Sequence, residues 1–362
     1  MANTCVDGRA LLANAATDAQ EPPFISVIVP VRNEQAFIES TLRQLLRQDY
    51  ERFEVIVADG ESTDATPDIV RRLACEYDNL ELVPNPGRWS SAGRNAGLRI
   101  ARGDIVLVVD GHCDVSDPNH LSHLSDALKR SGADCIGRPQ PLDVRNATPL
   151  QRAIAVARSS RLGHHPSSRI YSSEESFVQP HSVAVAYRRS VFDAVGQFDD
   201  AFDACEDVEF NHRVAHAGLR CFFTPRVAVH YHPRSSISGL FRQMVRYGRG
   251  RVRLLRKHRE TFSIACFLPA LFLLGLVAGP LFAWHSPWLA ATYASVVAVY
   301  AAVVAATSIG LSLQARDLRF LPWLPLVFGA IHLGAGFGVL RECVARGNRS
   351  ATREWRVQEQ VP

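Results

Sequence analysis

The chain has 362 residues, which is long enough for one large domain or two smaller ones. Its formal net charge of +4 comes from an almost purely arginine set, with Lys129 and Lys257 as the only lysines. Together with the abundant alanine, this composition reflects GC-rich coding better than a nucleic-acid-binding surface, so we expect no nucleic-acid partner. The eight cysteines contain no CxxC pair, which argues against a zinc ribbon or a disulfide framework and indicates a reduced, cytosolic catalytic part.

Residues 1–21 are rich in alanine and polar side chains and lack the basic-then-apolar pattern of a signal peptide, so we expect a poorly ordered tail. Beyond them, short apolar runs alternate with segments of helical spacing. The expected strands cover 24–30, 53–58, 80–84, 104–110 and 133–137, and the expected helices cover 36–47, 64 onward, 90–101 and 118–130. This alternation predicts an α/β fold with a mostly parallel sheet and a ligand site beyond the carboxyl ends of its strands.

After about residue 140 the pattern is less regular. The stretch 163–176 is rich in serine, histidine and arginine and is expected to be a loop. Helices are expected at 149–160 and 206–216, and strands at 183–187 and 227–231. We therefore expect one catalytic domain covering residues 22–236.

A basic amphipathic helix is expected at 237–260, where eight arginine and lysine side chains precede the first acid, Glu260. Such a run suits a solvated face, a nucleic-acid patch or a membrane surface. Because it adjoins an apolar segment directly, we favour an interfacial helix on the anionic cytoplasmic leaflet.

Membrane-length apolar segments follow within 261–341. The segments 262–284 and 288–313 contain no charged residue and are long enough to span a bilayer. A third, 320–340, is interrupted by prolines and glycines. Three full spans would place the arginine-rich tail, 342–362, opposite the basic helix, against the positive-inside rule, whereas a third segment lying in the interface would return it to the cytoplasm.

Asp110-Gly111-His112 stands at the end of the strand expected at 104–110. Its polar side chains are therefore expected at the carboxyl edge of the sheet. Two ligands this close can hold Mg²⁺ or Mn²⁺ while a diphosphate supplies further oxygens. A strand end followed by a turn is the plainer alternative. Asp114 could serve in a shifted arrangement, and Asp117 before a proline is typical of a helix N-cap.

Glu206-Asp207 opens an expected helix. Acidic residues there stabilise the helix dipole, which would be a purely structural role. A carboxylate at this place can also act as a general base toward an acceptor hydroxyl.

Weaker signals accompany these acids. Asp59 follows an expected strand and could bind a base or ribose, whereas Asp64 and Thr66 suit capping of the next helix. The stretch 87–97 is a glycine- and arginine-rich entry to a helix, suited to anions, but it is neither a P-loop nor GxGxxG. His230 and His232 share one face of an expected strand, and one of them is a weak candidate for an additional metal ligand.

In their order along the chain, these stretches resemble glycosyltransferase family 2, an inverting family with the GT-A fold. VIVPVRNE at 27–34, DGESTDAT at 59–66, GRNAG at 93–97, the DxD-like Asp110–His112, Glu206-Asp207 and QMVRY at 243–247 carry the resemblance. It covers about residues 24–260. With the C-terminal apolar segments it is closest to succinoglycan-type exopolysaccharide glycosyltransferases.

The resemblance implies a role for each matching residue. Donor-binding residues would be Pro30, Glu34, Asp59, Arg94 and Asp110, with Asp59 on the base and Arg94 near the nucleotide. Asp110 and His112 would bind the metal, and His112 replaces the family's second aspartate. Asp207 would be the catalytic base beside Glu206, and Gln243, Arg246 and Tyr247, the last replacing tryptophan, would contact the diphosphate or acceptor.

A single-sugar transfer from a UDP- or GDP-linked donor to a polyprenyl-diphosphate-bound saccharide is the function that the resemblance implies, at the inner membrane with a cytoplasmic catalytic domain. A polyprenyl-phosphate sugar synthase and an inactive nucleotide-sugar-binding scaffold are the alternatives. All of this requires Asp59, Asp110 and Asp207 to converge on one cavity.

Overall fold

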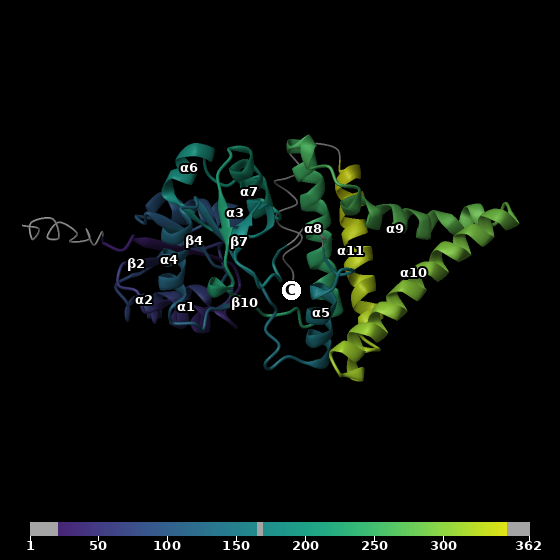
Figure 1. Ribbon diagram of the computed structural model, residues 1–362, viewed down its shortest axis with the longest axis horizontal. Helices are drawn as coiled ribbons and strands as arrows, with labels where there is room; N and C mark the ends of the chain where they lie inside the picture. Colours follow the sequence, from purple (N-terminus) through teal and green to yellow (C-terminus); the bar gives the residue numbers. More distant parts are fainter. Residues whose placement is uncertain (1–20, 165–168, 346–362) are drawn as a thin grey trace, which may run out of the picture.

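The computed structural model describes residues 21–164 and 169–345 (Figure 1). The strands are β1 (Ile25–Val31), β2 (Phe53–Asp59), β3 (Leu80–Pro84), β4 (Ile105–Val108), β5 (Cys113–Asp114), β6 (Cys135–Gly137), β7 (Ser176–Val178), β8 (Ala184–Arg188), β9 (Cys221–Phe223) and β10 (His230–Tyr231). The α-helices are α1 (Ile38–Leu46), α2 (Thr66–Ala74), α3 (Ser90–Ile100), α4 (His120–Ser131), α5 (Pro149–Ser159), α6 (Arg189–Val195), α7 (Glu206–His216), α8 (Ile237–Lys257), α9 (Ile264–Ala283), α10 (Pro287–Gln314) and α11 (Leu324–Val344). The 3₁₀ turns are η1 (Pro180–Ser182), η2 (Pro225–Val227), η3 (Arg259–Thr261) and η4 (Leu318–Phe320).

Eight strands form one twisted sheet in the order β3-β2-β1-β4-β8-β6-β9-β7. The pairs β2–β3, β1–β2, β1–β4 and β6–β9 are parallel, and β8 and β7 run against their neighbours. Six of the eight strands therefore point the same way, which confirms the mostly parallel sheet predicted from the sequence. Their shared direction brings the ends of β1, β2 and β4 to one edge.

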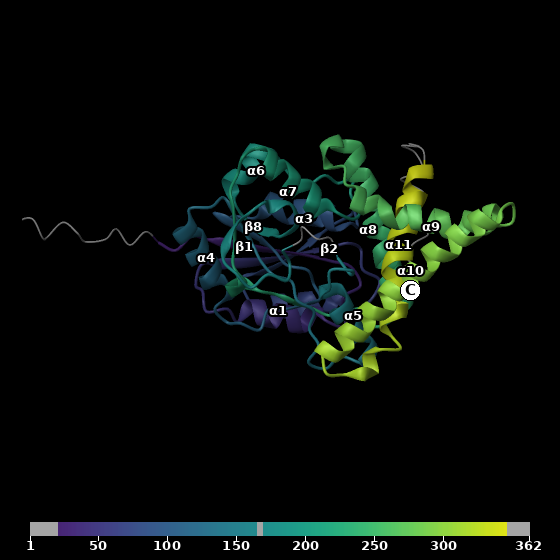
Figure 2. The same ribbon diagram turned by 45° about the vertical axis from the view of Figure 1, so that its right-hand side comes forward.

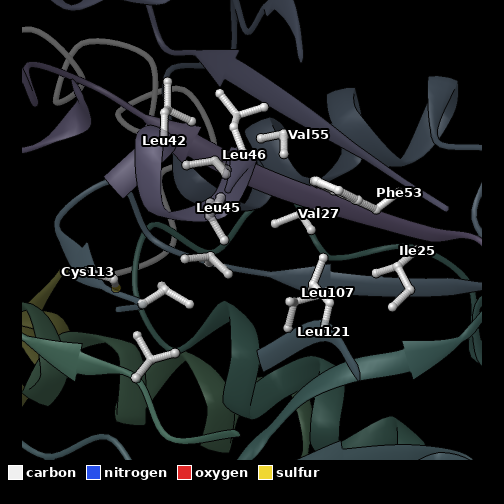
Figure 3. Packing of buried hydrophobic residues seen from close by; sticks show 14 of the residues in the cluster. Ile25, Val27, Leu42, Leu45, Leu46, Phe53, Val55, Leu107, Cys113 and Leu121 are labelled. Atoms are coloured by element: carbon white, nitrogen blue, oxygen red, sulfur yellow. The ribbon is translucent and has the colours of Figure 1, made fainter. Parts of the chain in front are cut away.

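The side-chain alternation of the central strands divides the core into two layers. Ile25 and Val27 of β1 face a layer that α1 covers with leucines, among them Leu42 and Leu45 (Figure 3). Ile28 points the other way, into an aromatic-rich layer beneath α7. Since both faces are covered, the strands read as continuous apolar runs in the sequence.

One buried polar network interrupts this core. Ser26 Oγ donates to Glu54 Oε1 at 2.6 Å, and the Arg102 backbone N–H and Nε donate to the two Glu54 oxygens at 2.8 and 2.9 Å. Burial by itself would raise the pKa of Glu54, but these hydrogen bonds outweigh it and lower the pKa from its ordinary value of 4.5. The carboxylate is therefore ionised and satisfied inside the protein.

The irregular middle of the chain is where the sequence predictions were incomplete. The strand predicted at 227–231 is wrong in its first half, because η2 reaches Val227 and only β10 is extended, paired antiparallel with β5. β7 and β9 were not predicted, since three residues are too few to show a period of two. Of the loop predicted at 163–176, residues 165–168 lie outside the described residues, and Ser176 begins β7 at the sheet edge.

The three C-terminal helices α9, α10 and α11 are each long and apolar enough to cross a membrane. α9 and α10 extend away from the sheet as an open hairpin in both views (Figures 1 and 2). They expose most of their apolar side chains, whereas α11 is half buried. α11 is therefore packed into the protein in a way that the other two helices are not.

α8 and α11 lie side by side and run parallel. A Cβ on Gly338 would lie 2.9 Å from Val245 Cα, and one on Gly334 would lie 2.9 Å from Met244 Cβ. At Gly248, a Cβ would lie 2.9 Å from the Val339 nitrogen. The helices approach this closely because glycines occupy the contact, as small residues do in packed membrane helices.

Ionic contacts extend the same interface. Glu342 of α11 is 7% exposed and contacts three arginines of α8. Arg249 Nε lies 3.1 Å from Glu342 Oε2, Arg253 Nε 2.9 Å from Oε1, and Arg256 Nη2 donates to the backbone oxygen at 2.5 Å. The sequence had assigned the whole basic run to a membrane-facing surface. For Arg249 and Arg253 this was wrong, because both side chains lie inside the α8–α11 interface.

Candidate functional site

A cleft of about 710 Å³ opens at the carboxyl edge of the sheet, closed on its far side by the start of α7 and by α8. It is lined by all but one of the residues predicted for the site, although these come from segments spread over more than two hundred positions. The lining predicted residues are Pro30, Glu34, Arg94, Asp110, His112, Glu206, Asp207, Gln243, Arg246 and Tyr247.

Asp59 is the exception. It ends β2 beside Val31 and Pro84, but it does not line the cleft. Its Oδ2 accepts a hydrogen bond from the Ser62 N–H at 3.1 Å, and its buried Oδ1 has no hydrogen-bond partner among the described residues. The predicted convergence of three carboxylates on one cavity is therefore correct for Asp110 and Asp207 and wrong for Asp59.

Asp110 and His112 project from the loop after β4 into the cleft. His112 Nδ1 lies 3.0 Å from Glu34 Oε1. Because a carboxylate can only accept, Nδ1 carries the proton in this pair and Nε2 keeps its lone pair. Burial lowers the pKa of His112, but the Glu34 hydrogen bond and charge, with Asp110, outweigh it and raise the pKa.

This arrangement fits a divalent cation. Metal-binding histidines almost always donate the second ring N–H to a carboxylate or carbonyl, which fixes the tautomer, and Glu34 provides that carboxylate here. The Asp110 carboxylate and the His112 Nε2 are then the available protein ligands. An imidazole nitrogen beside a carboxylate suits Mn²⁺ better than Mg²⁺, which prefers oxygen.

Arg94 is the positive centre of the site. Its Nη2 lies 3.2 Å from Glu206 Oε1, and both side chains are nearly buried. Burial would lower the pKa of Arg94, but the charges of Glu206, Asp207 and Asp110 raise it. Glu206 pairs with this guanidinium directly, and Asp207 and Asp110 act on it through their charge.

The two acids at the start of α7 have different environments. Burial raises the pKa of Glu206, Arg94 opposes that rise, and the neighbouring charge of Asp207 adds to it. Asp207 is half buried, lines the cleft and forms no ion pair with another described residue. Glu206 is therefore paired with Arg94, and Asp207 is the carboxylate better placed to contact a ligand in the cleft.

The segment that delivers these acids is strained. Cys205, the residue before α7, has φ 62° and ψ 22°, a left-handed conformation that non-glycine residues seldom adopt. Asn33 and Arg88, which also line the cleft, have φ 54° and 66°. Strained backbone of this kind gathers at functional sites, where the surrounding structure holds it in place.

The glycine-rich stretch 93–97 lies within α3, where the sequence predicted a helix at 90–101. A Cβ on Gly93 would lie 3.0 Å from Pro30 Cβ, and one on Gly97 would press on Ile28. These glycines let α3 lie against β1, and Arg94 between them reaches the cleft as a result.

α8 contributes the remaining predicted residues. Arg246 Nη2 donates to the Asp203 backbone oxygen at 2.7 Å, and Gln243 Nε2 donates to the Tyr247 hydroxyl at 3.3 Å. The Arg158 guanidinium lies 5.9 Å from the centre of the Tyr247 ring. α8 therefore gives the cleft that Asp207 lines a basic and aromatic wall.

Arg138 is the main lining residue that the sequence reasoning missed. It follows β6, is 1% exposed, and donates through Nη2 to the Val108 oxygen at 3.3 Å. Its Nε and Nη1 have no hydrogen-bond partner among the described residues. A polar residue directly after an apolar strand was the available signal, the same one that identified Asp110.

The other early candidates have ordinary roles. Asp114 is buried and paired with Arg145, Asp117 accepts a hydrogen bond from the Asn119 N–H at 2.9 Å, and neither lines the cleft. His230 is exposed in β10, whereas His232 lines the cleft and stacks on Phe37 with ring centres 4.8 Å apart.

Comparisons with known proteins agree with this geometry. Residues 26–196 match the profile of glycosyl transferase family 2. Succinoglycan biosynthesis protein ExoA of Rhizobium meliloti (strain 1021) is 31% identical over 323 residues, covering 87% of this chain and 94% of that protein. A Methanococcus voltae protein named dolichyl N-acetyl-alpha-D-glucosaminyl phosphate 3-beta-D-2,3-diacetamido-2,3-dideoxy-beta-D-glucuronosyltransferase is 25% identical, covering 70% and 80% of the two chains.

Among solved structures, mannosyltransferase PcManGT from Pyrobaculum calidifontis, in complex with GDP-Man and Mn²⁺, superposes with a TM-score of 0.57 and 22% identity. The match covers 89% of this chain and 88% of that one. The likeness confirms the predicted GT-A fold.

Proposed function

The chain belongs to glycosyltransferase family 2, and from this premise we propose that it moves one sugar from a UDP- or GDP-linked donor to a lipid-linked saccharide, with inversion at the anomeric carbon. It is a glycosyltransferase of the exopolysaccharide or cell-envelope glycan type. The observation that supports the reaction most directly is that Asp110, His112, Arg94 and Asp207 all line one cleft.

In the proposed reaction, the acceptor hydroxyl loses its proton to Asp207 as its oxygen attacks the anomeric carbon. The new glycosidic bond forms as the bond to the nucleoside diphosphate breaks, so the leaving group departs on the face opposite the attack. A divalent cation bound by Asp110 and His112, Mg²⁺ or Mn²⁺, would stabilise the charge on the departing diphosphate. Arg94 holds Glu206, which keeps the start of α7 in place.

Donor recognition is assigned to the opposite end of the cleft. Arg88 and Asn85 line it next to β3, close to where Asp59 ends β2. Arg138 adds a buried guanidinium whose Nε and Nη1 have no hydrogen-bond partner among the described residues, which suits a phosphate or another anionic group. Asp59, which the family resemblance placed on the base, lies beside this end of the cleft without lining it, so we do not assign it a contact with the donor.

The acceptor is proposed to be a polyprenyl-diphosphate-bound saccharide. The Methanococcus voltae relative is named for transfer to a dolichyl-linked sugar, and ExoA is named for succinoglycan biosynthesis. The cleft wall formed by Gln243, Arg246 and Tyr247 belongs to α8, the helix that packs on α11. An acceptor headgroup at the membrane surface would therefore enter beside these residues.

The packing of α8 on α11 also supports a proposal for how the chain would sit in an inner membrane. α8 carries several charged arginines and cannot cross hydrocarbon, and α11 runs parallel to it through the contacts at Gly334 and Gly338. The two helices must then share one depth, at the interface. α9 is about 30 Å long, the thickness of the hydrocarbon core, so α9 and α10 form the membrane-crossing hairpin.

The hairpin topology removes the conflict with the positive-inside rule. Trp284 and Trp288, 89% and 83% exposed at the hairpin tip, suit the far interface, where tryptophan is enriched. The catalytic domain and the arginine-rich tail then both lie on the cytoplasmic side.

Reporter fusions in a bacterial host test this topology. A C-terminal fluorescent protein should be bright and a C-terminal alkaline phosphatase inactive, while phosphatase inserted at His285 should be active. An active C-terminal phosphatase would show that α11 spans the membrane and that the hairpin topology is wrong.

A donor screen tests the reaction. Native membranes containing the protein are incubated with nucleotide sugars, and release of free UDP or GDP is measured. Asp207→Asn should slow release by about 10²- to 10⁴-fold, the usual contribution of a general base. Asp117→Asn, which changes a half-exposed aspartate outside the cleft, is the matched control.

The acceptor is tested by comparing bare polyprenyl phosphate with a polyprenyl-diphosphate saccharide. Turnover on the bare phosphate alone would identify a polyprenyl-phosphate sugar synthase instead. Equal nucleotide release by wild type and Asp207→Asn would remove Asp207 from its role, and binding of donor without turnover on any acceptor would indicate an inactive scaffold.

A further inference from the structure

A second cluster of metal-ligating side chains lies where α8 leads into the membrane hairpin. His212 comes from α7, and His258 and Glu260 come from the turn between α8 and α9. None of the three lines the cleft. Their ligand atoms all lie within 4.8 Å of one another.

The two histidines converge on a single carboxylate oxygen. His212 Nε2 lies 2.8 Å from Glu260 Oε1, and His258 Nδ1 lies 3.8 Å from the same atom. Ligands bound tetrahedrally at about 2.0–2.2 Å from one zinc ion lie roughly 3.3 Å apart. The observed spacings fall on both sides of that value, so only small side-chain movements are needed to bind a cation.

His258 is oriented for metal binding by a buried carboxylate. Its Nε2 lies 3.0 Å from Oε1 of Glu209, which is fully buried in α7. The carboxylate accepts the Nε2 proton, so Nδ1 carries the lone pair and faces the cluster. This is the same outer arrangement that Glu34 gives His112 in the cleft.

His212 is not satisfied by hydrogen bonds alone. It is 8% exposed, and its Nδ1 has no hydrogen-bond partner among the described residues. Nε2 is the nitrogen that faces the cluster, and a metal there would take its lone pair while the ring proton moves to Nδ1.

We propose that His212, His258 and Glu260 form a second metal site, selective for Zn²⁺ or a similar transition metal, that ties the catalytic helix to the base of the membrane hairpin. Two imidazoles and one carboxylate are a zinc ligand set, unlike the oxygen-rich surroundings that Mg²⁺ prefers. Asp207 lies five residues before His212, about 7.5 Å along α7. The metal therefore fixes the height of the catalytic base relative to the membrane segments.

Cobalt substitution tests the site directly. The full-length protein is purified in detergent with a tag that contains no histidine, stripped with chelator and titrated with Co²⁺. The expected result is one equivalent of Co²⁺ with the visible absorption of a tetrahedral site, displaced by Zn²⁺. Glu260→Gln and His258→Asn should each weaken binding by about tenfold or more.

Two controls separate this site from other metal binding. His216→Asn removes an exposed histidine one turn further along α7, with its ring 6.3 Å from that of His212, and should bind Co²⁺ as wild type does. Asp110→Asn removes a ligand of the cleft and should also leave the cobalt spectrum unchanged.

Thermal unfolding gives an independent measurement. Zn²⁺ should raise the unfolding temperature of wild type and His216→Asn more than that of Glu260→Gln, which keeps the cleft site and whose half-exposed side chain can be changed without disturbing the core. Absence of the cobalt absorption, or its equal loss in His216→Asn, would overturn the proposal. So would an equal zinc effect in Glu260→Gln.

Discussion

The close contact between α8 and α11 allows a change in an apolar C-terminal helix to be traced to the cleft. In Gly338→Ala, the new methyl group would lie 2.9 Å from the Cα and carbonyl carbon of Val245 and nearer still to its oxygen. These are backbone atoms, which cannot rotate away. We expect α8 to be displaced by about 1 Å, because ordinary contact begins near 3.4 Å.

The expected change in the free energy of unfolding of Gly338→Ala is the sum of two opposing contributions. Replacing a helical glycine by alanine stabilises a helix by about 1 kcal/mol, whereas overpacking costs about 1–3 kcal/mol. Because only backbone can yield here, we expect a net loss of about 2 kcal/mol. Val245 precedes Arg246, which lines the cleft, and a 1 Å misplacement of a site residue can cost about 100-fold in rate.

Gly329→Ala provides the matched control, since it lies on the same helix and an added Cβ meets nothing within 4 Å. Both variants are compared with wild type by thermal unfolding in detergent and by donor turnover. Gly338→Ala should unfold earlier and turn over more slowly, and Gly329→Ala should match or exceed wild-type stability. If the two variants behave alike, the α8–α11 packing described here is incorrect.

Three further changes test the site and the core. Arg94→Met should destabilise the protein by about 3 kcal/mol by leaving Glu206 buried and unpaired, and the double change with Glu206→Gln should recover most of that loss in thermal unfolding. Glu34→Gln should weaken metal activation by about 10- to 100-fold, measured as the Mn²⁺ concentration needed for half-maximal nucleotide release, and an unchanged requirement would argue against His112 as a ligand. Glu54→Gln should lower stability at neutral pH by about 1.5–3 kcal/mol. Because the folded-state pKa of Glu54 is lowered, its contribution is present above the ordinary value of 4.5 and is lost as pH falls through the folded-state value, so the unfolding temperatures of wild type and variant should converge in acid.

The sequence alone determined the central sheet and most of the cleft. The strands β1, β2 and β4 are buried on both faces, so they appear as unbroken apolar runs, and parallel strands deliver the residues that follow them to a single edge. That is why Asp110 could be placed correctly from local pattern. The three apolar helices were visible for the same reason, since their length and composition are local properties.

The features that only the tertiary structure decided arise from contacts between residues that are far apart in the sequence. The Arg249–Glu342 contact joins residues 93 positions apart, and it places part of a basic run inside the protein where composition predicted a membrane-facing surface. Arg138 enters the cleft because β6 lies near β4 in the sheet, with β8 between them, and Asp59 stays outside although its strand was predicted correctly. Local periodicity states which face of an element is apolar but not what packs on it. The packing of α11 on α8 could therefore not be read from hydropathy.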